Sequence, residues 1–321
     1  MEKICQDIKI IFMGTPEFGA IILEMLCQTE FKPVLVITTP DKPVGRKQIL
    51  TSPPTKISAK KYKIPVIQPE ILANSKSEIL NSKPDIIVVA SFGQILPKEI
   101  LEIPKHGTLN VHPSLLPKYR GASPVQHTIL NGDKETGITV MLMDEKMDHG
   151  KIISTVEYHI PNKINYKKLK EKLANLGSEL LIKTIPKWMA GEIKPVEQDH
   201  LKATFTKILK KEDGKINWQK PAEFIERKVR ALDPWPGTWT IWQKSNNKTQ
   251  RIKILKTRIL NSRYPKTYPI GKVLVAPQNE VCIQTGNGFL VIEKLQLEGK
   301  NITNSEEFLR GHQDFIGTVL K

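Results

Sequence analysis

Residues 108–121 have the sequence TLNVHPSLLPKYRG, in which a short apolar segment runs into a proline-rich one. Alternation over Thr108–His112 predicts a strand, so the side chains of Asn110 and His112 leave it on the same face. Prolines do not continue a central strand, and Pro113–Gly121 is therefore expected to form a loop wall. Ligands of open α/β sheets bind at the carboxyl ends of the strands, which is where this sequence places both polar side chains.

Strands and helices alternate around this segment in the first half of the chain. Short runs rich in Val and Ile predict strands at Ile8–Phe12, Val34–Thr38, Ile86–Ala90, Thr108–His112 and Ile138–Met143. Amphipathic stretches predict helices at Pro16–Gln28, Pro54–Tyr62, Ile71–Asn81, Pro124–Leu130 and Tyr166–Met189. This alternation predicts an α/β domain with a doubly wound, mostly parallel sheet that helices cover on both faces.

The composition changes after the long helix. Residues 191–206 are polar and lack a periodic pattern, as is typical of a linker. Beyond them, short strands are expected at Thr238–Trp242, Arg251–Leu260, Lys272–Ala276, Val281–Thr285 and Phe289–Leu297, after a helix at Ala222–Ala231. We therefore predict an N-terminal domain at 1–190, a linker at 191–207 and a C-terminal OB-like β-barrel domain at 208–321.

The overall composition is that of a water-soluble protein. The apolar share is 39% and the charged share 26%, and no run approaches the roughly 18–20 apolar residues of a membrane helix. No leader for export is recognisable. The three cysteines are far apart and form no CxxC pair, which disfavours a zinc site and fits a reducing cytoplasm. We expect a cytoplasmic protein without a membrane partner.

Positive charge is concentrated in the last third of the chain. The net charge is +16; residues 1–200 hold 27 Lys and Arg against 22 Asp and Glu, whereas residues 201–321 hold 22 against 11. A polyanionic partner such as nucleic acid is one reason for such a surface. A lysine-rich proteome that places Lys on solvated faces is the alternative.

Asp148 lies in MDHG, residues 147–150, a turn after the next predicted strand. An amide and an imidazolium can stabilise a tetrahedral oxyanion, and a carboxylate can orient the imidazole and manage the proton, so Asn110, His112 and Asp148 together would suit acyl transfer. A satisfied polar cluster at a strand end is the alternative, and for any one of these residues taken alone it is preferred. The alternating pair with its loop favours chemistry.

The first predicted strand ends in GTPEFG, residues 14–19. The segment is neither a GxGxxG motif nor a P-loop, since no Lys-Ser/Thr follows the second glycine. A nicotinamide oxidoreductase is therefore disfavoured. Tight packing between strand and helix explains the glycines as well as an anion site would.

NVHPSLLPKYRG at 110–121 resembles the signature of enzymes that formylate amines with 10-formyltetrahydrofolate. The resemblance continues in five further segments: MGTPEF at 13–18, PDKPVGR at 40–46, SFGQIL at 91–96, MDHG at 147–150 and RALDPWPGTW at 230–239. Together they resemble the methionyl-tRNA formyltransferase family over essentially the full length. The DKPxGR loop and the basic second domain narrow the resemblance to the enzymes that act on tRNA.

The resemblance implies transfer of a formyl group from 10-formyltetrahydrofolate to the methionine α-amine of charged initiator tRNA. Asn110 and protonated His112 would hold the developing oxyanion, while Asp148 would orient His112 and help take up the amine proton. Neither a metal nor a covalent intermediate is needed. The folate would lie along nine residues: Phe92, Gly93, Gln94, Ile95, Leu96, Ser114, Leu115, Leu116 and Pro117. Core packing is an equal alternative for Leu96 and Leu116.

Two basic segments are the candidates for tRNA contact. The loop between Thr39 and Pro54 carries Lys42, Arg46 and Lys47, and in the family this loop meets the acceptor end of the tRNA, which makes Arg46 the preferred contact. Alternation in the second domain places Arg251 and Lys253 on one strand face, where they would contact phosphates. Three tryptophans could stack on bases, although positions in the barrel core and against the linker are preferred for them: Trp235, Trp239 and Trp242.

Two further interpretations stay open. An amino-sugar formyltransferase would share the three site residues, but it has less reason to concentrate charge after residue 200. A non-catalytic RNA-binding protein on the same scaffold would be free to lose them. The expected partners are charged initiator tRNA and the folate, and a monomer is the default expectation.

Overall fold

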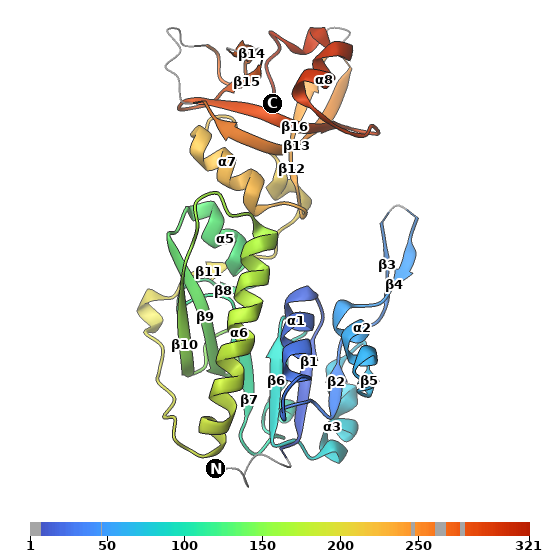
Figure 1. Ribbon diagram of the computed structural model, residues 1–321, viewed down its shortest axis with the longest axis vertical. Coiled ribbons are helices and arrows are strands. Elements are labelled where there is room, and N and C mark those ends of the chain that lie inside the picture. The colour runs from blue at the N-terminus through green and yellow to red at the C-terminus, as the bar shows by residue number, and fades with distance from the viewer. Residues whose placement is uncertain (1–7, 46, 245–247, 261–267, 277–279) are drawn as a thin grey trace. The chain divides into compact units, whose positions relative to one another are not determined.

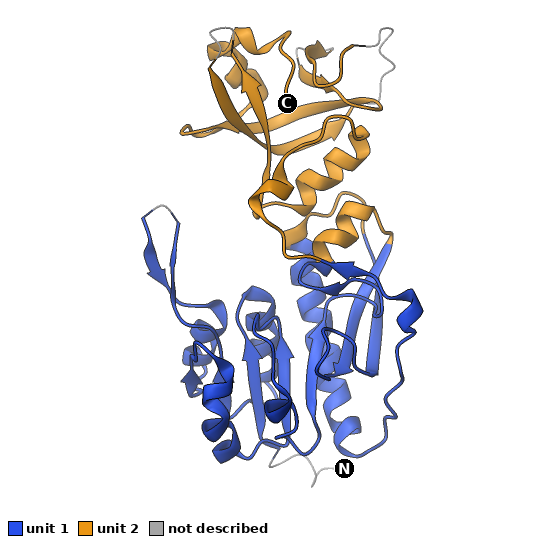
Figure 2. Cartoon of the chain, turned by 180° about the vertical axis from the view of Figure 1, so that it is seen from behind, with its two compact units in different colours: residues 1–124, 135–160, 168–206 blue, residues 125–134, 161–167, 207–321 orange. Residues whose placement is uncertain are grey.

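The computed structural model describes residues 8–45, 47–244, 248–260, 268–276 and 280–321. The chain divides into two compact units, shown in Figure 2. Unit 1 comprises residues 1–124, 135–160 and 168–206, and unit 2 comprises residues 125–134, 161–167 and 207–321. Residues 191–206 thus group with unit 1, and two short segments from the predicted N-terminal domain, 125–134 and 161–167, group with unit 2. The domain boundaries at 190 and 208 stay predictions.

Unit 1 is built on a seven-stranded sheet of order β10-β9-β7-β6-β1-β2-β5. Its strands are β1 Ile10–Gly14, β2 Leu35–Ile37, β5 Val66–Ile67, β6 Ile86–Ala90, β7 Thr108–His112, β9 Glu135–Leu142 and β10 Ile152–His159. All neighbours from β5 to β7 pair in parallel, whereas β9 runs antiparallel to β7 and β10 antiparallel to β9. The predicted mostly parallel sheet is confirmed. The two edge strands are not among the predicted strands. Strand β5 has only two residues, and β10 buries little and alternates exposed polar residues.

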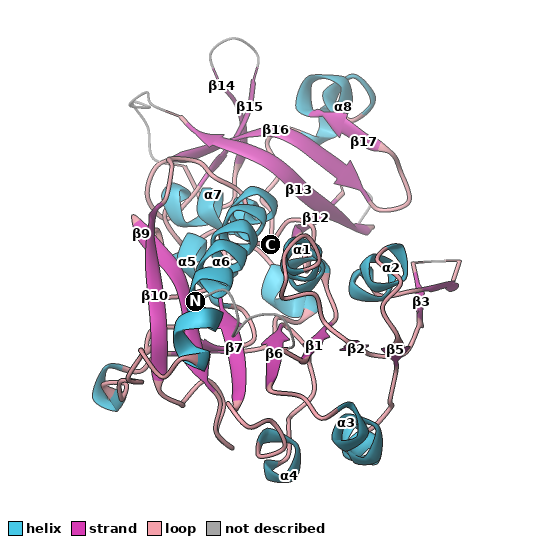
Figure 3. Ribbon diagram, turned by 60° about the horizontal axis from the view of Figure 1, so that its bottom comes forward, coloured by secondary structure: helices cyan, strands magenta, loops and turns pink. Residues whose placement is uncertain are grey.

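Helices cover both faces of this sheet. Figure 3 shows α1, α2 and α6 on one face and α3 and α4 on the other. Their bounds are α1 Glu17–Leu26, α2 Pro54–Lys61, α3 Lys76–Ser82, α4 Lys98–Leu101 and α6 Tyr166–Met189, while α5 Pro124–Asn131 lies mostly in unit 2. A Cβ at Gly19 would lie 2.6 Å from the Ala90 carbonyl oxygen. Close packing of α1 on the sheet therefore explains this glycine without any anion site.

A β-hairpin occupies the region where the sequence predicts a long loop. Strands β3 Lys42–Val44 and β4 Ile49–Thr51 pair antiparallel, and Figure 1 shows them standing away from the rest of unit 1. Gly45 turns the chain with a φ of 73°. The side chains of Val44, Ile49 and Leu50 are exposed. Since none of them is buried, burial supplies little of the hairpin's stability.

Unit 2 is built on an antiparallel sheet of order β12-β13-β16-β15-β14, with β17 added beside β16. The bounds are β12 Thr238–Gln243, β13 Thr249–Ile259, β14 Val273–Ala276, β15 Glu280–Gln284, β16 Phe289–Leu297 and β17 Ile302–Asn304. Helix α7 Ala222–Ala231 precedes the sheet and α8 Ser305–Gly311 follows it. The predicted OB-like domain of five strands and a helix is confirmed, and β17 and α8 are additions.

Residues 317–321 join the two end strands of this sheet. On one side, the N–H groups of Val273 and Gly317 bond the carbonyls of Thr318 and Val273, both at 2.9 Å. On the other, Ile241 and Lys321 exchange backbone bonds of 2.9 and 3.1 Å. The segment lies between β14 and β12 and closes the sheet around its core, as full closure of a small barrel requires.

We expect Leu320→Ala to destabilise unit 2 by roughly 2–5 kcal/mol, because Leu320 is buried in the barrel core within the closing segment. Denaturant unfolding followed by tryptophan fluorescence would measure the effect, since four of the five tryptophans lie in unit 2. Val319→Ala, at a partly exposed neighbour, is the control. Equal midpoints for the two variants would contradict a closing role for the segment.

Candidate active site

Strand β7 supplies the first two site residues. Asn110 and His112 occupy alternate positions on it, so both side chains leave the same face. They are 8% and 4% exposed, respectively. The neighbouring strands β6 and β9 pair with the Asn110 backbone and hold both residues at the carboxyl end of β7. The predicted strand bounds are confirmed.

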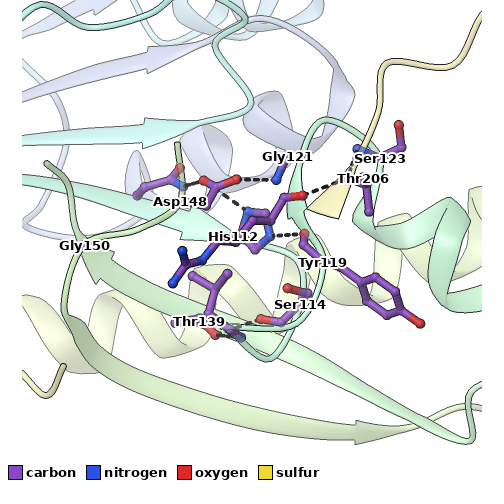
Figure 4. A network of polar contacts seen from close by, with 12 residues as sticks. His112, Ser114, Tyr119, Gly121, Ser123, Thr139, Asp148, Gly150 and Thr206 are labelled. Carbon is purple, nitrogen blue, oxygen red and sulfur yellow. Dashed lines mark hydrogen bonds and ion pairs between the residues drawn. The ribbon is translucent and has the colours of Figure 1, made fainter. Parts of the chain in front are cut away.

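The carboxylate of Asp148 meets both side chains. Its Oδ1 accepts a hydrogen bond of 3.3 Å from Asn110 Nδ2 and lies 3.6 Å from His112 Nδ1, a distance of electrostatic contact. Its Oδ2 accepts a bond of 2.7 Å from the backbone N–H of Gly121, as Figure 4 shows. The structure thus brings together the three residues that the sequence selects.

The hydrogen bond at the far side of the imidazole identifies the nitrogen that faces the site. His112 Nε2 lies 3.1 Å from the carbonyl oxygen of Tyr119. A carbonyl can only accept, so Nε2 carries a hydrogen and donates it. Nδ1 therefore faces Asp148 and is the ring atom that can gain or lose a proton in the site.

Thr139 on β9 anchors the proline-rich loop. Its buried hydroxyl donates to the Ser114 carbonyl at 2.7 Å and accepts from the Leu116 N–H at 3.1 Å. Inside the loop, Ser114 Oγ donates to the Lys118 carbonyl at 2.5 Å. These bonds satisfy backbone groups of Ser114, Leu116 and Lys118, which lie in no strand. They fix the shape of the loop beside His112.

The polar segment before residue 207 completes the wall. Thr204 accepts from the N–H groups of Tyr119 and Arg120, each at 2.8 Å, through its hydroxyl and its carbonyl. Strand β8, Arg120–Gly121, then pairs in parallel with β11, Phe205–Thr206. A Cβ at Gly121 would lie 2.4 Å from the Thr206 carbonyl oxygen. The sequence predicts only a linker at 191–206 and none of these contacts, because an irregular polar segment carries no periodic signal.

The predicted folate residues divide into buried and exposed groups. Phe92 and Leu96 pack in the core of unit 1, and Ser114 and Leu116 are also buried. Ile95 is 82% exposed and Gly93, with a φ of 88°, is also exposed. Gln94, Leu115 and Pro117 are half-buried. The two segments follow β6 and β7, which are adjacent parallel strands, so both border the same edge of the sheet. Their contact with folate stays a prediction.

Asp41 braces the base of the β3–β4 hairpin. Its carboxylate accepts from Lys56 Nζ at 2.8 Å, from Gln68 Nε2 at 2.8 Å and from Ser52 Oγ at 3.0 Å. These bonds, first that of Gln68 and then that of Lys56, lower the pKa of Asp41 to about 2. Lys42 and Lys47 are exposed on the hairpin, whereas Arg46 lies outside the described residues.

Strand β13 has the predicted two-faced pattern. Ile252 and Ile254 are buried in the barrel core, and Lys253 is exposed on the opposite face beside half-buried Arg251. The Arg251 guanidinium lies 4.3 Å from the ring centroid of Trp239, at cation–π distance.

The tryptophans named as possible stacking residues differ in burial. Trp242 is fully buried, which agrees with the preferred core interpretation. Trp239 is half-buried. Trp235 is 59% exposed and so lies outside the barrel core, and its Nε1 donates to the Leu209 carbonyl at 3.2 Å. An indole in a short loop after a helix has no periodic pattern that could have predicted its exposure.

Neither a metal-ligand cluster nor a membrane-spanning helix occurs among the described residues. No three His, Cys, Asp or Glu side chains there gather as ligands of a metal ion would. No helix within those residues is long and apolar enough to cross a membrane.

Two family models and several curated proteins match the chain. The model "Formyl transferase" matches residues 8–185, and "Formyl transferase, C-terminal domain" matches residues 208–313. A methionyl-tRNA formyltransferase of Bacillus velezensis is 42% identical over 315 residues, 97% of each chain. Its counterpart from Halalkalibacterium halodurans is 42% identical over 317 residues, 97% of this chain and 98% of its own.

A solved structure has the same fold. It is a sugar 3N-formyltransferase crystallised in the presence of dTDP and 5-N-formyl-THF. It superposes with a TM-score of 0.62 at 23% identity, over 92% of this chain and 99% of that one. At this identity the likeness supports the fold alone.

The Asp41 contacts predict a pH-dependent difference between the parent and Asp41→Asn. A lowered folded-state pKa stabilises the protein fully above the ordinary value of 3.8, and this contribution is lost as the pH falls toward about 2. The parent should therefore be the more stable protein at neutral pH, with the gap closing between pH 4 and 2. Urea midpoints measured across this range test the prediction, and a gap that stays constant would contradict it.

Proposed function

The chain belongs to the methionyl-tRNA formyltransferase family, and we propose that Asn110, His112 and Asp148 are the residues with which it transfers a formyl group from 10-formyltetrahydrofolate to the α-amine of methionyl-tRNA. The product is N-formylmethionyl-tRNA for translation initiation. The observation that carries the proposal is the convergence of the three side chains at the carboxyl end of β7.

Asn110 and His112 stabilise the charge that develops during attack. The amine nitrogen bonds the formyl carbon, and the formyl oxygen becomes an oxyanion as the tetrahedral intermediate forms. One amide hydrogen of Asn110 bonds Asp148, and the other is directed at the oxyanion. Protonated Nδ1 of His112 donates to the same oxygen, because Nε2 is engaged by the Tyr119 carbonyl.

Asp148 handles the proton. Its carboxylate lies 3.6 Å from Nδ1 and pairs with the charged imidazole that the reaction uses. The attacking amine loses a proton to this carboxylate, directly or through water. When the bond between the formyl carbon and the folate nitrogen breaks, the carboxylate returns the proton to that nitrogen. The folate is a substrate of the reaction. It binds along the segments at 92–96 and 114–117, which border the same edge of the sheet.

The substrate, the oligomeric state and the cellular location are inferred from the family and from the charge of the chain. Curated relatives at 42% identity over nearly the full length support methionyl-tRNA, and the charge of +11 after residue 200 supports a polyanionic substrate rather than a sugar nucleotide. Each site residue comes from unit 1 of one chain, which supports action as a monomer. We place the enzyme in the cytoplasm, where charged tRNA is used.

The two units divide the work on tRNA. The basic face of β13 supplies affinity through phosphates, without reading bases. The β3–β4 hairpin, with Lys42, Arg46 and Lys47, supplies placement of the acceptor end. The brace at Asp41 supports this role, since it holds the base of an otherwise exposed hairpin.

We expect Asn110→Ala and His112→Ala each to lower kcat by roughly a hundred- to a thousandfold, the usual effect of removing one oxyanion donor. Folding should be retained and is checked by circular dichroism. Formylation of charged initiator tRNA gives the rate. Near-parental turnover in a folded variant would remove that residue from the mechanism.

Asp148→Asn keeps the side chain's size but can neither take a proton nor form an ion pair with a charged His112, so we expect strong loss of activity. The pH–rate profile is the informative measurement. A profile equal to the parent's in height and shape would make Asp148 a structural residue only.

Charge reversal at Arg251 and Lys253 should weaken binding of many RNAs alike and reduce the salt slope by about 1 for each phosphate that the variant no longer neutralises. Lys98→Glu, on the surface of unit 1, is the control. Arg46→Ala should instead lower kcat/KM on charged initiator tRNA more than it lowers RNA affinity, because misplacement spoils attack geometry. An unchanged salt slope in the barrel variants, or a purely salt-dependent loss with Arg46→Ala, would refute this division.

A further inference from the structure

Gln198 lies in the segment for which the sequence predicts a linker, yet its side chain is among the buried polar groups of unit 1. It is 4% exposed. Two residues earlier, Val196 exchanges backbone bonds of 2.8 Å with Ile152 at the start of β10, which holds the segment against the sheet. A buried amide costs free energy unless its donors and acceptor are satisfied, so its partners show what it does here.

The amide of Gln198 is saturated on both sides. Nε2 donates to the carbonyls of Asp148 and Gly150 at 3.0 and 2.7 Å. Oε1 accepts two bonds from the Arg120 guanidinium, at 3.2 and 2.6 Å. A guanidinium only donates and a carbonyl only accepts, so a flipped amide would lose all four bonds. The orientation of this side chain is therefore determined by its neighbours.

The turn that Gln198 holds contains a residue in the left-handed region. Asp148 has a φ of 48°, which is uncommon for a residue with a side chain, although Asp tolerates it better than most. Gly150 is packed against β9, where an added Cβ would lie 1.9 Å from the Leu142 carbonyl oxygen. The bonds that Gln198 donates to the Asp148 and Gly150 carbonyls hold the backbone of this turn in place.

Arg120 connects Gln198 to the segment that binds the Asp148 carboxylate. It is buried, and besides Gln198 its guanidinium donates to His200 Nδ1 at 2.8 Å. Arg120 directly precedes Gly121, whose N–H binds Asp148 Oδ2. Gln198 thus bonds the backbone carbonyl of Asp148 and the side chain of Arg120. Arg120 is the neighbour of Gly121, whose N–H binds the Asp148 carboxylate.

We propose that Gln198 is a positioning residue for the formyl-transfer reaction, which acts by holding the Asp148 turn so that the carboxylate faces Asn110 and His112. The proposal rests on the proposed role of Asp148. Gln198 itself need not touch either substrate. Its loss should therefore lower the rate of the chemical step and leave substrate binding nearly unchanged.

A double-mutant cycle with Asp148 tests this coupling. Gln198→Met keeps the length and removes the amide, and we expect kcat to fall about a hundredfold while KM for both substrates stays within roughly threefold. In an Asp148→Asn background the same change should cost less than about twofold, because the group it positions is already disabled. Gln284→Met is the matched control: Gln284 is a buried glutamine in unit 2 whose amide also donates to two loop carbonyls, and kcat should be retained.

Gln198→Glu tests the two hydrogen-bond donors of the amide while the size and shape of the side chain are kept. The carboxylate still accepts from Arg120 but cannot donate to the Asp148 and Gly150 carbonyls, so kcat should fall as it does with methionine. If the methionine variant does not fold, this variant carries the cycle. A folded Gln198→Glu protein with parental kcat, or equal losses in both backgrounds, would overturn the proposal. If Asp148→Asn alone loses no activity, the proposed function fails instead.

Discussion

The carboxylate of Asp148 joins three segments of unit 1 that are distant in sequence. Its two oxygens contact the Asn110 amide, the His112 imidazole and the backbone N–H of Gly121. Asp148 is half-buried, and a carboxylate that is partly removed from water must be matched by hydrogen-bond donors, so its position constrains the groups around it. Strand β7, the loop after it and the turn at 147–150 each have one geometry in which these contacts form together.

The segments around the site are held in place mainly by hydrogen bonds to backbone groups, and less by side-chain packing. The proline-rich loop cannot join the sheet, and the hydroxyls of Thr139 and Thr204 satisfy its N–H and carbonyl groups instead. Parallel pairing of β8 with β11 adds the last wall. In the proposed reaction the attack geometry tolerates little displacement, so these hydrogen bonds would matter for the rate beyond their modest contribution to stability.

Much of the fold could be predicted because burial leaves a pattern in the chain. The observed bounds of β6, β7, α6 and α7 agree with the predicted ones to the residue. Strand β6 is a continuous apolar run, β7 alternates apolar and polar residues, and the two helices have a helical period. Edge strand β10 and the β3–β4 hairpin bury little and carry no such signal. The closing segment at 317–321 is short, and its partners β12 and β14 are separated along the chain.

Residue chemistry and local periodicity were enough to predict that Asn110, His112 and Asp148 lie close together, because alternation on one strand and a nearby turn limit where those side chains can go. Neither could identify Gln198, Thr204 or Thr206 as neighbours of the site. These residues lie in an irregular segment, and their partners are backbone groups some 50 to 86 positions away. Such contacts exist only after the chain has folded back on itself, and hydrogen bonds to backbone place no demand on sequence pattern that local inspection could detect.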